Sequence, residues 1–163
     1  MTLRIQTFLM GEIDVEERDL IFFPRGLPGF EKFHRWVLAG EEENSVKWLI
    51  SADCGQITLP VACPSVIDRE YSPRIPEDIL EDLGIEDLEN ALILAVLNLP
   101  RERPWEGTAN FLAPLVLNPD NKRARQVVIS DERYSVYTPL LSKADTDCLQ
   151  TEEKQAGTEE GGH

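Results

Sequence analysis

A ten-residue segment rich in proline and glycine, residues 22–31, constrains the fold more than any other part of the sequence. It reads Phe-Phe-Pro-Arg-Gly-Leu-Pro-Gly-Phe-Glu, with two prolines and two glycines between large apolar side chains. Proline fixes φ and glycine permits positive φ, so the chain must follow one specified path here. The phenylalanines are costly to leave in water. The segment is therefore either a buried corner that closes a small β-domain or part of a surface that binds a partner.

Length and composition indicate one globular domain followed by a polar tail. The chain has 163 residues, of which 42% are hydrophobic and 28% are charged, enough for a sizeable core. Residues 143–163 are polar, acidic and rich in threonine and glycine. We therefore expect a folded domain over 1–142 and a disordered acidic tail over 143–163.

The charge of the chain is strongly negative, with a formal net charge of -14 at pH 7. The tail holds only six of the 30 acidic residues, so residues 1–142 are acidic in their own right. Such a surface repels nucleic acid and attracts basic partners, although solubility alone would also explain it. Two small basic clusters, at 101–103 and 122–125, do not form the footprint that nucleic acid needs. We expect no direct contact with nucleic acid.

The cysteines and the N-terminus indicate a reduced, cytoplasmic compartment. Three cysteines are present, an odd number without the spacing of a disulfide framework. No signal peptide follows Met1, and no apolar run is long enough to span a bilayer. We therefore expect a cytoplasmic protein without a membrane partner.

Short apolar segments separated by turn residues predict eight or nine β-strands. The predicted strands are 3–15 (with Gly11 as a turn or bulge), 20–23, 36–39, 46–50, 57–63, 91–99, 111–118, 125–130 and a last edge at 134–141. Pro60 lies within the strand at 57–63 and predicts an edge position or a bulge there. The strand at 91–99 is apolar throughout, which is typical of burial on both faces.

Helical signals are few. Residues 76–83 begin with proline, carry acidic residues in the first turn and are followed by Gly84, a good residue for a helix C-terminus. A helical turn at 30–33 is a second candidate. Together these elements predict a mainly β fold, a small antiparallel β-barrel-like single domain with one or two short helices.

Residues suited to catalysis or metal binding are sparse. The chain has two histidines, His34 and His163, and no histidine–cysteine cluster with metal-ligand spacing. Neither phosphate-binding glycine fingerprint is present. We therefore expect no enzyme activity, cofactor, metal or small-molecule substrate. The alternative is a small hydrolase that uses Ser51 or Cys54 as nucleophile, although the only internal histidine is distant in sequence.

Two motifs give the sequence a family resemblance. The first is Gly-Leu-Pro-Gly-Phe-Glu at 26–31, and the second is Thr-x-Asn-x-x-Ala-Pro-x-Val-x-Asn at 108–118. Segments 48–53, 76–84 and 123–128 accompany them in order and at matching spacing. The set resembles the FliW family of flagellar assembly factors over about residues 3–140. Thr58 and Ala124 depart from the usual family residues without breaking the pattern.

The resemblance implies a β-barrel-like protein that binds two partners and catalyses nothing. One implied partner is flagellin, held in the cytoplasm before export. The other is CsrA, the small basic RNA-binding repressor of flagellin translation. Binding of the two is implied to be mutually exclusive, so that the factor freed by flagellin export antagonises CsrA and flagellin synthesis follows assembly.

Candidate partner-binding residues lie around the two motifs. They are Phe30, Tyr71, Asn110, Leu115, Val116, Leu117 and Asn118. Tyr71 and the residues of 115–117 are either interface or core. Asn110 and Asn118 flank an apolar strand, and the alternative for both is to satisfy backbone groups at its ends.

Overall fold

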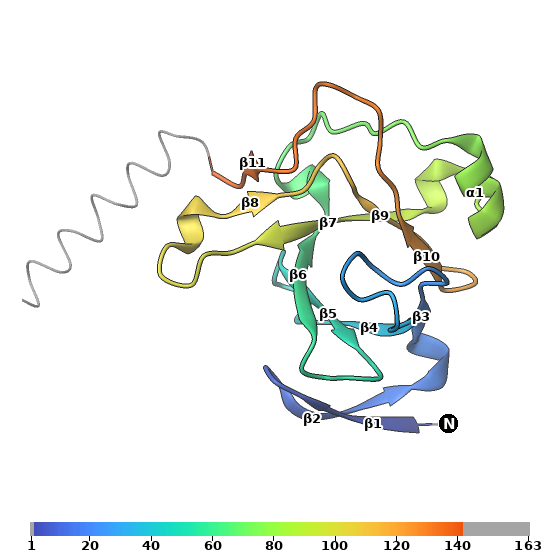
Figure 1. The fold of residues 1–163 in the computed structure, drawn as a ribbon, viewed down its shortest axis with the longest axis vertical. Coiled ribbons are helices and arrows are strands. Elements are labelled where there is room, and N and C mark those ends of the chain that lie inside the picture. The colour runs from blue at the N-terminus through green and yellow to red at the C-terminus, as the bar shows by residue number, and fades with distance from the viewer. Residues whose placement is uncertain (1, 142–163) are drawn as a thin grey trace, which may run out of the picture.

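The computed structural model describes residues 2–141, so the expected tail at 143–163 lies outside the described residues (Figure 1). The strands are β1 Thr2–Thr7, β2 Gly11–Glu16, β3 Ile21–Phe22, β4 Arg35–Ala39, β5 Lys47–Ser51, β6 Thr58–Ala62, β7 Leu92–Asn98, β8 Thr108–Ala109, β9 Leu115–Asn118, β10 Arg123–Gln126 and β11 Thr138–Pro139. The helices are α1 Glu77–Leu83 and the 3₁₀ turns η1 Glu17–Asp19, η2 Pro64–Val66, η3 Leu88–Asn90 and η4 Pro104–Glu106.

Seven strands close into a barrel, as the sequence predicted. Each strand pairs with the next in the order β7, β6, β5, β4, β3, β10 and β9, and β9 pairs back with β7 (Figure 1). All of these pairings are antiparallel except one, because β3 runs parallel to β10 with Phe22 opposite Arg123. The short strands β8 and β11 extend the sheet beyond β7.

The N-terminal segment forms a hairpin outside the barrel, so of the two alternatives for Gly11, a turn or a bulge, the structure has the turn. Strands β1 and β2 pair with each other in a separate two-stranded sheet. The Thr7 hydroxyl fixes the turn, since it accepts a hydrogen bond from the Met10 amide at 2.9 Å and donates to the Gly11 carbonyl at 2.6 Å. The hairpin packs on the outer face of β4 and β5, where Ile5 and Val15 form a cluster with Val37 and Ile50.

The turn between β3 and β4 fills one mouth of the barrel, which confirms the buried-corner interpretation for most of its residues. Figure 1 shows this segment inside the ring of strands. Phe23 and Leu27 are buried and belong to the same cluster as Trp36, Leu49 and Leu115 in the barrel interior. Trp36 is fully buried, and its indole nitrogen donates to the Phe33 carbonyl at 2.9 Å.

Phenylalanine side chains anchor this turn on the tryptophan. The rings of Phe23 and Phe30 meet the Trp36 ring edge-on, with centroids 6.3 and 6.2 Å away. Edge-to-face packing of aromatic rings at this distance is favourable. The segment expected as a helical turn at 30–33 is a single hydrogen-bonded turn, in which the Phe33 amide donates to the Phe30 carbonyl, and it does not extend into a helix.

The other differences from the predicted elements have local causes. Helix α1 begins after Pro76 and ends at Gly84, whose φ of +72° gives the expected left-handed terminus. Strand β6 lies between β5 and β7, so it is not an edge strand. Its pairing with β7 begins only at Val61, the residue after Pro60, which has no amide proton to donate. Strand β9 begins at Leu115, because Pro114 and the bend before it interrupt the predicted strand at 111–118.

The glycines of the turn provide a test of this packing. Gly26→Ala is expected to destabilise the protein more than Gly29→Ala. Both residues have positive φ, +64° and +85°, so each alanine incurs a strain of about 1–2 kcal/mol. A Cβ on Gly26 would also lie 2.6 Å from the Glu31 Cα, whereas a Cβ on Gly29 would meet no atom within 4 Å. Urea unfolding of both variants measures the difference, and equal losses would contradict the steric part of this prediction.

Candidate partner-binding site

The first motif forms a closed loop whose polar groups bond to one another. The Gly26 amide donates to the Phe23 carbonyl at 2.9 Å, and the Phe30 amide donates to the Leu27 carbonyl at 2.7 Å. The Gly29 amide donates to the Glu31 carboxylate at 3.0 Å. Backbone hydrogen bonds from Glu31 and Gly29 lower the pKa of the Glu31 carboxyl. The motif therefore specifies a rigid loop with Phe30 held at its rim.

A groove of about 590 Å³, which we call the turn groove, lies between this loop and the neighbouring strands. Its lining comprises Arg25, Gly26, Leu27, Pro28, Phe30, Glu31, Leu59, Val96, Asn110, Ala113, Arg125, Gln126 and Val128. Most of these side chains are apolar, and Val128 is 73% exposed. An exposed apolar surface on a soluble domain is typical of a site that binds another molecule.

The charges at the turn groove differ from those of the whole chain. Two guanidinium groups, from Arg25 and Arg125, and one carboxylate, from Glu31, belong to the lining. Arg125 also lies 3.9 Å from the Asp82 carboxylate of α1, so its position is partly fixed. A chain of net charge -14 thus offers two cations beside an apolar surface, which suits an apolar segment that carries negative charge.

Of the candidate residues, Phe30 and Asn110 line the turn groove. Leu115, Val116 and Leu117 are buried, because β9 is covered on both faces, and none of them lines the turn groove. Leu115 and Leu117 point into the barrel interior, and Val116 packs in a second cluster that includes Leu83 of α1. The structure thus places these three residues in the core, which was the other interpretation of their pattern.

The two asparagines bond to backbone groups, as their alternative interpretation predicted. The Asn110 side-chain oxygen accepts from the Ala113 amide at 3.0 Å and shapes the bend before β9. The buried Asn118 amide donates to the carbonyls of Leu83 and Gly84 at 2.9 and 3.1 Å, where α1 ends. The second motif therefore joins the end of α1 to the end of β9.

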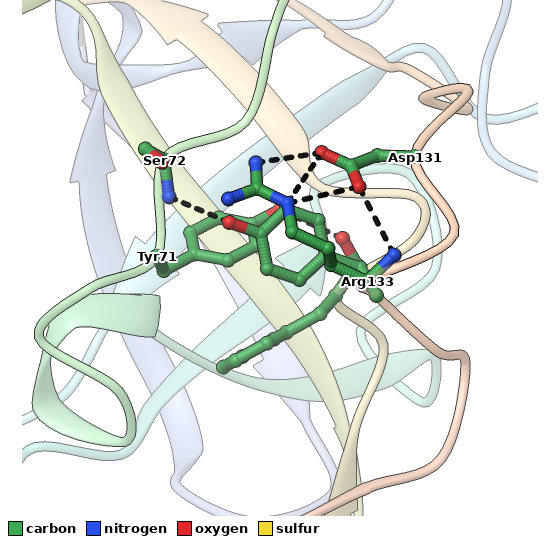
Figure 2. Close-up of polar contacts among 6 residues, drawn as sticks. Tyr71, Ser72, Asp131 and Arg133 are labelled. Atoms are coloured by element: carbon green, nitrogen blue, oxygen red, sulfur yellow. Dashed lines mark hydrogen bonds and ion pairs between the residues drawn. The ribbon is translucent and has the colours of Figure 1, made fainter.

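Tyr71 joins three segments that are distant in sequence (Figure 2). Its hydroxyl donates to the Phe111 carbonyl at 2.7 Å, and its ring lies 4.5 Å from the Phe111 ring and 4.7 Å from the Tyr134 ring. The Tyr134 hydroxyl in turn accepts from the Ser72 amide at 2.9 Å. Burial, and then Tyr134 and Asp131, raise the pKa of the Tyr71 phenol.

Arg133 covers the outer side of this aromatic cluster. Its guanidinium carbon lies 5.0 Å from the centre of the Tyr134 ring, and its nitrogens bond to the Asp131 carboxylate (Figure 2). These contacts make Tyr71 a tether between the segment before α1 and the segment after β10. It does not line the turn groove.

Of the residues considered for the hydrolase alternative, Ser51 and His34 both form hydrogen bonds with the backbone. Ser51 is fully buried, and its hydroxyl oxygen accepts from the amides of Asp53 and Cys54 at 3.2 and 3.1 Å. Nδ1 of His34 bonds to the Phe23 carbonyl at 3.0 Å. Across residues 2–141 no three His, Cys, Asp or Glu side chains gather as a metal site would require.

Within residues 2–141, no helix is long and apolar enough to cross a membrane, since the α-helix present has seven residues and is partly polar.

Sequence reasoning missed Arg25, Arg125, Gln126 and Val128 as part of the groove. Val128 lies in the predicted strand at 125–130, where its pattern is the same as that of a core residue. β10 ends at Gln126, and the side chain of Val128 then points to solvent. The two arginines are noticeable in the sequence because the chain as a whole is acidic. Only the fold, however, brings Arg25 and Arg125 together at one groove.

The fold and the groove define a small closed β-barrel with an apolar surface at one mouth. Comparison with protein-family models matches residues 4–140 to the FliW protein family. The chain therefore belongs to the FliW family, which confirms the resemblance drawn from its motifs.

Curated relatives and a solved structure agree with this assignment. The chain is 37% identical over 145 residues to a flagellar assembly factor FliW of Leptospira interrogans, covering 88% of this chain and 97% of the relative. It is 34% identical to the protein of the same name from Caldanaerobacter subterraneus, covering 86% and 95%. A crystal structure of the flagellar assembly factor FliW superposes with a TM-score of 0.80 at 24% identity, covering 86% and 98%, and shares the fold.

Replacing Asn118 tests whether its role is structural. Asn118→Ala is expected to lower the free energy of unfolding by about 1–3 kcal/mol, because it removes two hydrogen bonds to the end of α1 made by a buried side chain, one of them to the Gly84 carbonyl. Asn121→Ala is the matched control: this exposed side chain donates one bond to the same Leu83 carbonyl, and its loss is expected to cost less. Denaturant unfolding measures both changes. Wild-type stability together with lost partner binding would instead place Asn118 in a binding surface.

The lowered pKa of Glu31 predicts a pH dependence of stability. A carboxyl whose pKa is lower in the folded state stabilises the protein above its unfolded pKa, and this contribution disappears as pH falls through the folded pKa. The stability difference between wild type and Glu31→Gln is therefore expected to be constant near neutral pH and to shrink below its ordinary pKa of 4.5. Denaturant unfolding from pH 7 to pH 3 measures it, with Glu43→Gln as an exposed control. A difference that grows in acid would contradict the assignment.

Proposed function

We propose that this protein is a non-enzymatic chaperone that binds flagellin in the cytoplasm and, when free of flagellin, binds and antagonises the RNA-binding repressor CsrA. Flagellin synthesis would then be coupled to flagellar assembly. The observation that carries the proposal is the FliW family match, which spans the whole barrel and includes both motifs around the turn groove. The folded unit we assign to this function is residues 1–142, and residues 143–163 form the acidic tail of the sequence.

The turn groove is the surface we assign to flagellin. Terminal segments of unassembled flagellin are amphipathic, and a chaperone must cover their apolar face. The groove offers apolar contact through Phe30, Leu59, Val96 and Val128. It rests on a rigid loop, so little ordering entropy is lost when a segment binds.

Charge supports the second half of the proposal. Thirty acidic residues against 16 basic ones make the surface negative overall. Such a surface accelerates encounter with a basic protein and opposes the phosphates of RNA. A small basic repressor would therefore be drawn to this chain, whereas its RNA would be repelled.

An exposed apolar side chain provides the test. Val128→Asp is expected to weaken flagellin binding by about tenfold, because it places a charge in the apolar part of the groove. Val66→Asp is the control, since Val66 is 58% exposed and does not line the groove. Calorimetric titration of both variants with purified flagellin and with purified CsrA measures affinity, and melting curves are expected to match wild type.

The outcomes separate the function from its location. Wild-type protein that binds neither flagellin nor CsrA would overturn the proposed function. Wild-type protein that binds flagellin, together with a Val128→Asp variant of unchanged affinity, would overturn the assignment of the turn groove alone.

A further inference from the structure

A small cavity adjoins the turn groove, and we call it the arginine pocket because Arg25, Arg123 and Arg125 contribute to its lining. It has a volume of about 110 Å³ and lies between the turn, the end of α1 and strand β10. Arg25, Gly26 and Arg125 also line the turn groove, so the two cavities share one wall. A molecule seated in the turn groove can therefore place a side chain in the arginine pocket.

Strand β10 directs two of the arginines to the same side of the sheet. Side chains alternate along a strand, and the buried Ala124 packs in the barrel interior. Arg123 and Arg125, on either side of it, therefore lie on the outer face of β10, where α1 packs (Figure 1). Val116 is opposite Arg125 in β9 and packs on this same face with Leu83 of α1.

The charges of the arginine pocket do not cancel. Its lining has three guanidinium groups and one carboxylate, from Asp82. This carboxylate is mostly exposed and lies 3.9 Å from Arg125, so the pair is weak. Within residues 2–141 the side chains of Arg25 and Arg123 form no ion pair or hydrogen bond. Glu31 lines the turn groove but not the arginine pocket, so two guanidinium groups are left without a counter-charge.

The end of α1 contributes little negative charge to the arginine pocket. A helix C-terminus repels anions because its last carbonyl groups lack partners. Here the Leu83 carbonyl accepts from the side-chain amides of Asn118 and Asn121, both at 2.9 Å. The Gly84 carbonyl accepts from Asn118 at 3.1 Å. Because these carbonyls have donors, the guanidinium groups dominate the local charge.

The size of the arginine pocket and the charge of the whole chain favour a single carboxylate. A volume of about 110 Å³ holds a group of a few heavy atoms. Guanidinium groups bind carboxylates through short, charge-assisted hydrogen bonds. The net charge of -14 repels a polyanion such as nucleic acid at long range, whereas one carboxylate in an apolar segment meets far less of that repulsion.

We propose that the arginine pocket binds one aspartate or glutamate side chain of the segment that occupies the turn groove, with its carboxylate between the guanidinium groups of Arg25 and Arg123. This inference rests on the assignment of the turn groove to flagellin. It adds the feature by which the segment is selected, an apolar face with one acidic side chain beside it. Arg125 lines both cavities and marks where the apolar contact ends and the acidic contact begins.

The test uses the full chain and purified flagellin. Arg25→Gln combined with Arg123→Gln is expected to weaken flagellin binding by about tenfold, since it removes both unpaired guanidinium groups. Arg69→Gln combined with Arg101→Gln is the matched control: both arginines are exposed, line neither cavity and change the net charge equally. The control is expected to change affinity less than twofold. Calorimetric titration measures affinity, and melting curves are expected to match wild type.

Asp82→Asn gives a change that misfolding cannot imitate. It removes the one carboxylate of the arginine pocket and is expected to strengthen flagellin binding by about two- to threefold. Glu81→Gln is the control, since this exposed neighbour in α1 does not line the pocket. The same titration is expected to show no gain for the control.

Double-mutant cycles identify the group on flagellin. Each aspartate and glutamate of the flagellin terminal segments is replaced by its amide and titrated against wild type and against the variant that lacks Arg25 and Arg123. For one of these positions we expect a loss of about tenfold against wild type and of less than twofold against the double variant.

Four results would overturn the inference while the proposed function stands. They are equal flagellin affinity of wild type and the Arg25 and Arg123 double variant, an equal loss in the control pair, unchanged or weaker binding by Asp82→Asn, and cycles in which no carboxylate is coupled to the arginines. The second of these would show attraction by net charge alone. Flagellin that does not bind the wild-type protein would overturn the proposed function, and this inference with it.

Discussion

The packing of two phenylalanine rings against the edge of one buried tryptophan holds this structure together. Trp36 lies in the barrel interior, and Phe23 and Phe30 reach it from the turn between β3 and β4. The turn is thereby fixed in the barrel mouth. One side of the turn completes the core, and its rim forms a wall of the turn groove. The same residues therefore stabilise the fold and shape the candidate site, so the loop is the buried corner that its sequence allowed and also one wall of the turn groove.

Much of the fold could be predicted because its strongest signals are local. The positions of proline and glycine predicted the turn, helix α1 and the ends of most strands. The spacing of apolar residues predicted the barrel strands. The parallel seam between β3 and β10 had no such signal, since it joins Phe22 to Arg123. The sequence left the N-terminal segment open for a different reason: Gly11 suits a bulge and a turn equally, and the bonds of the Thr7 hydroxyl decide between them.

The candidate site was harder to predict, because burial depends on what covers each face of a strand. The apolar run at 115–117 fits a core or an interface equally well, and it is core because α1 covers the face that would otherwise be open. Val128 has the same residue type and pattern but lies beyond the end of β10, where nothing covers it.

The two-residue length of β3 also affects how the molecule reaches its folded state. Every other junction of the barrel ring is antiparallel and involves more residue pairs than the seam, where β10 meets β3 at Phe22 and Arg123 alone. Closing a ring between segments so far apart in sequence costs loop entropy that few contacts offset at that point. Long-range contacts of this kind slow folding. During synthesis the ring stays open until β10 has left the ribosome. The interior around Trp36 is therefore among the last parts of the chain to be shielded from water.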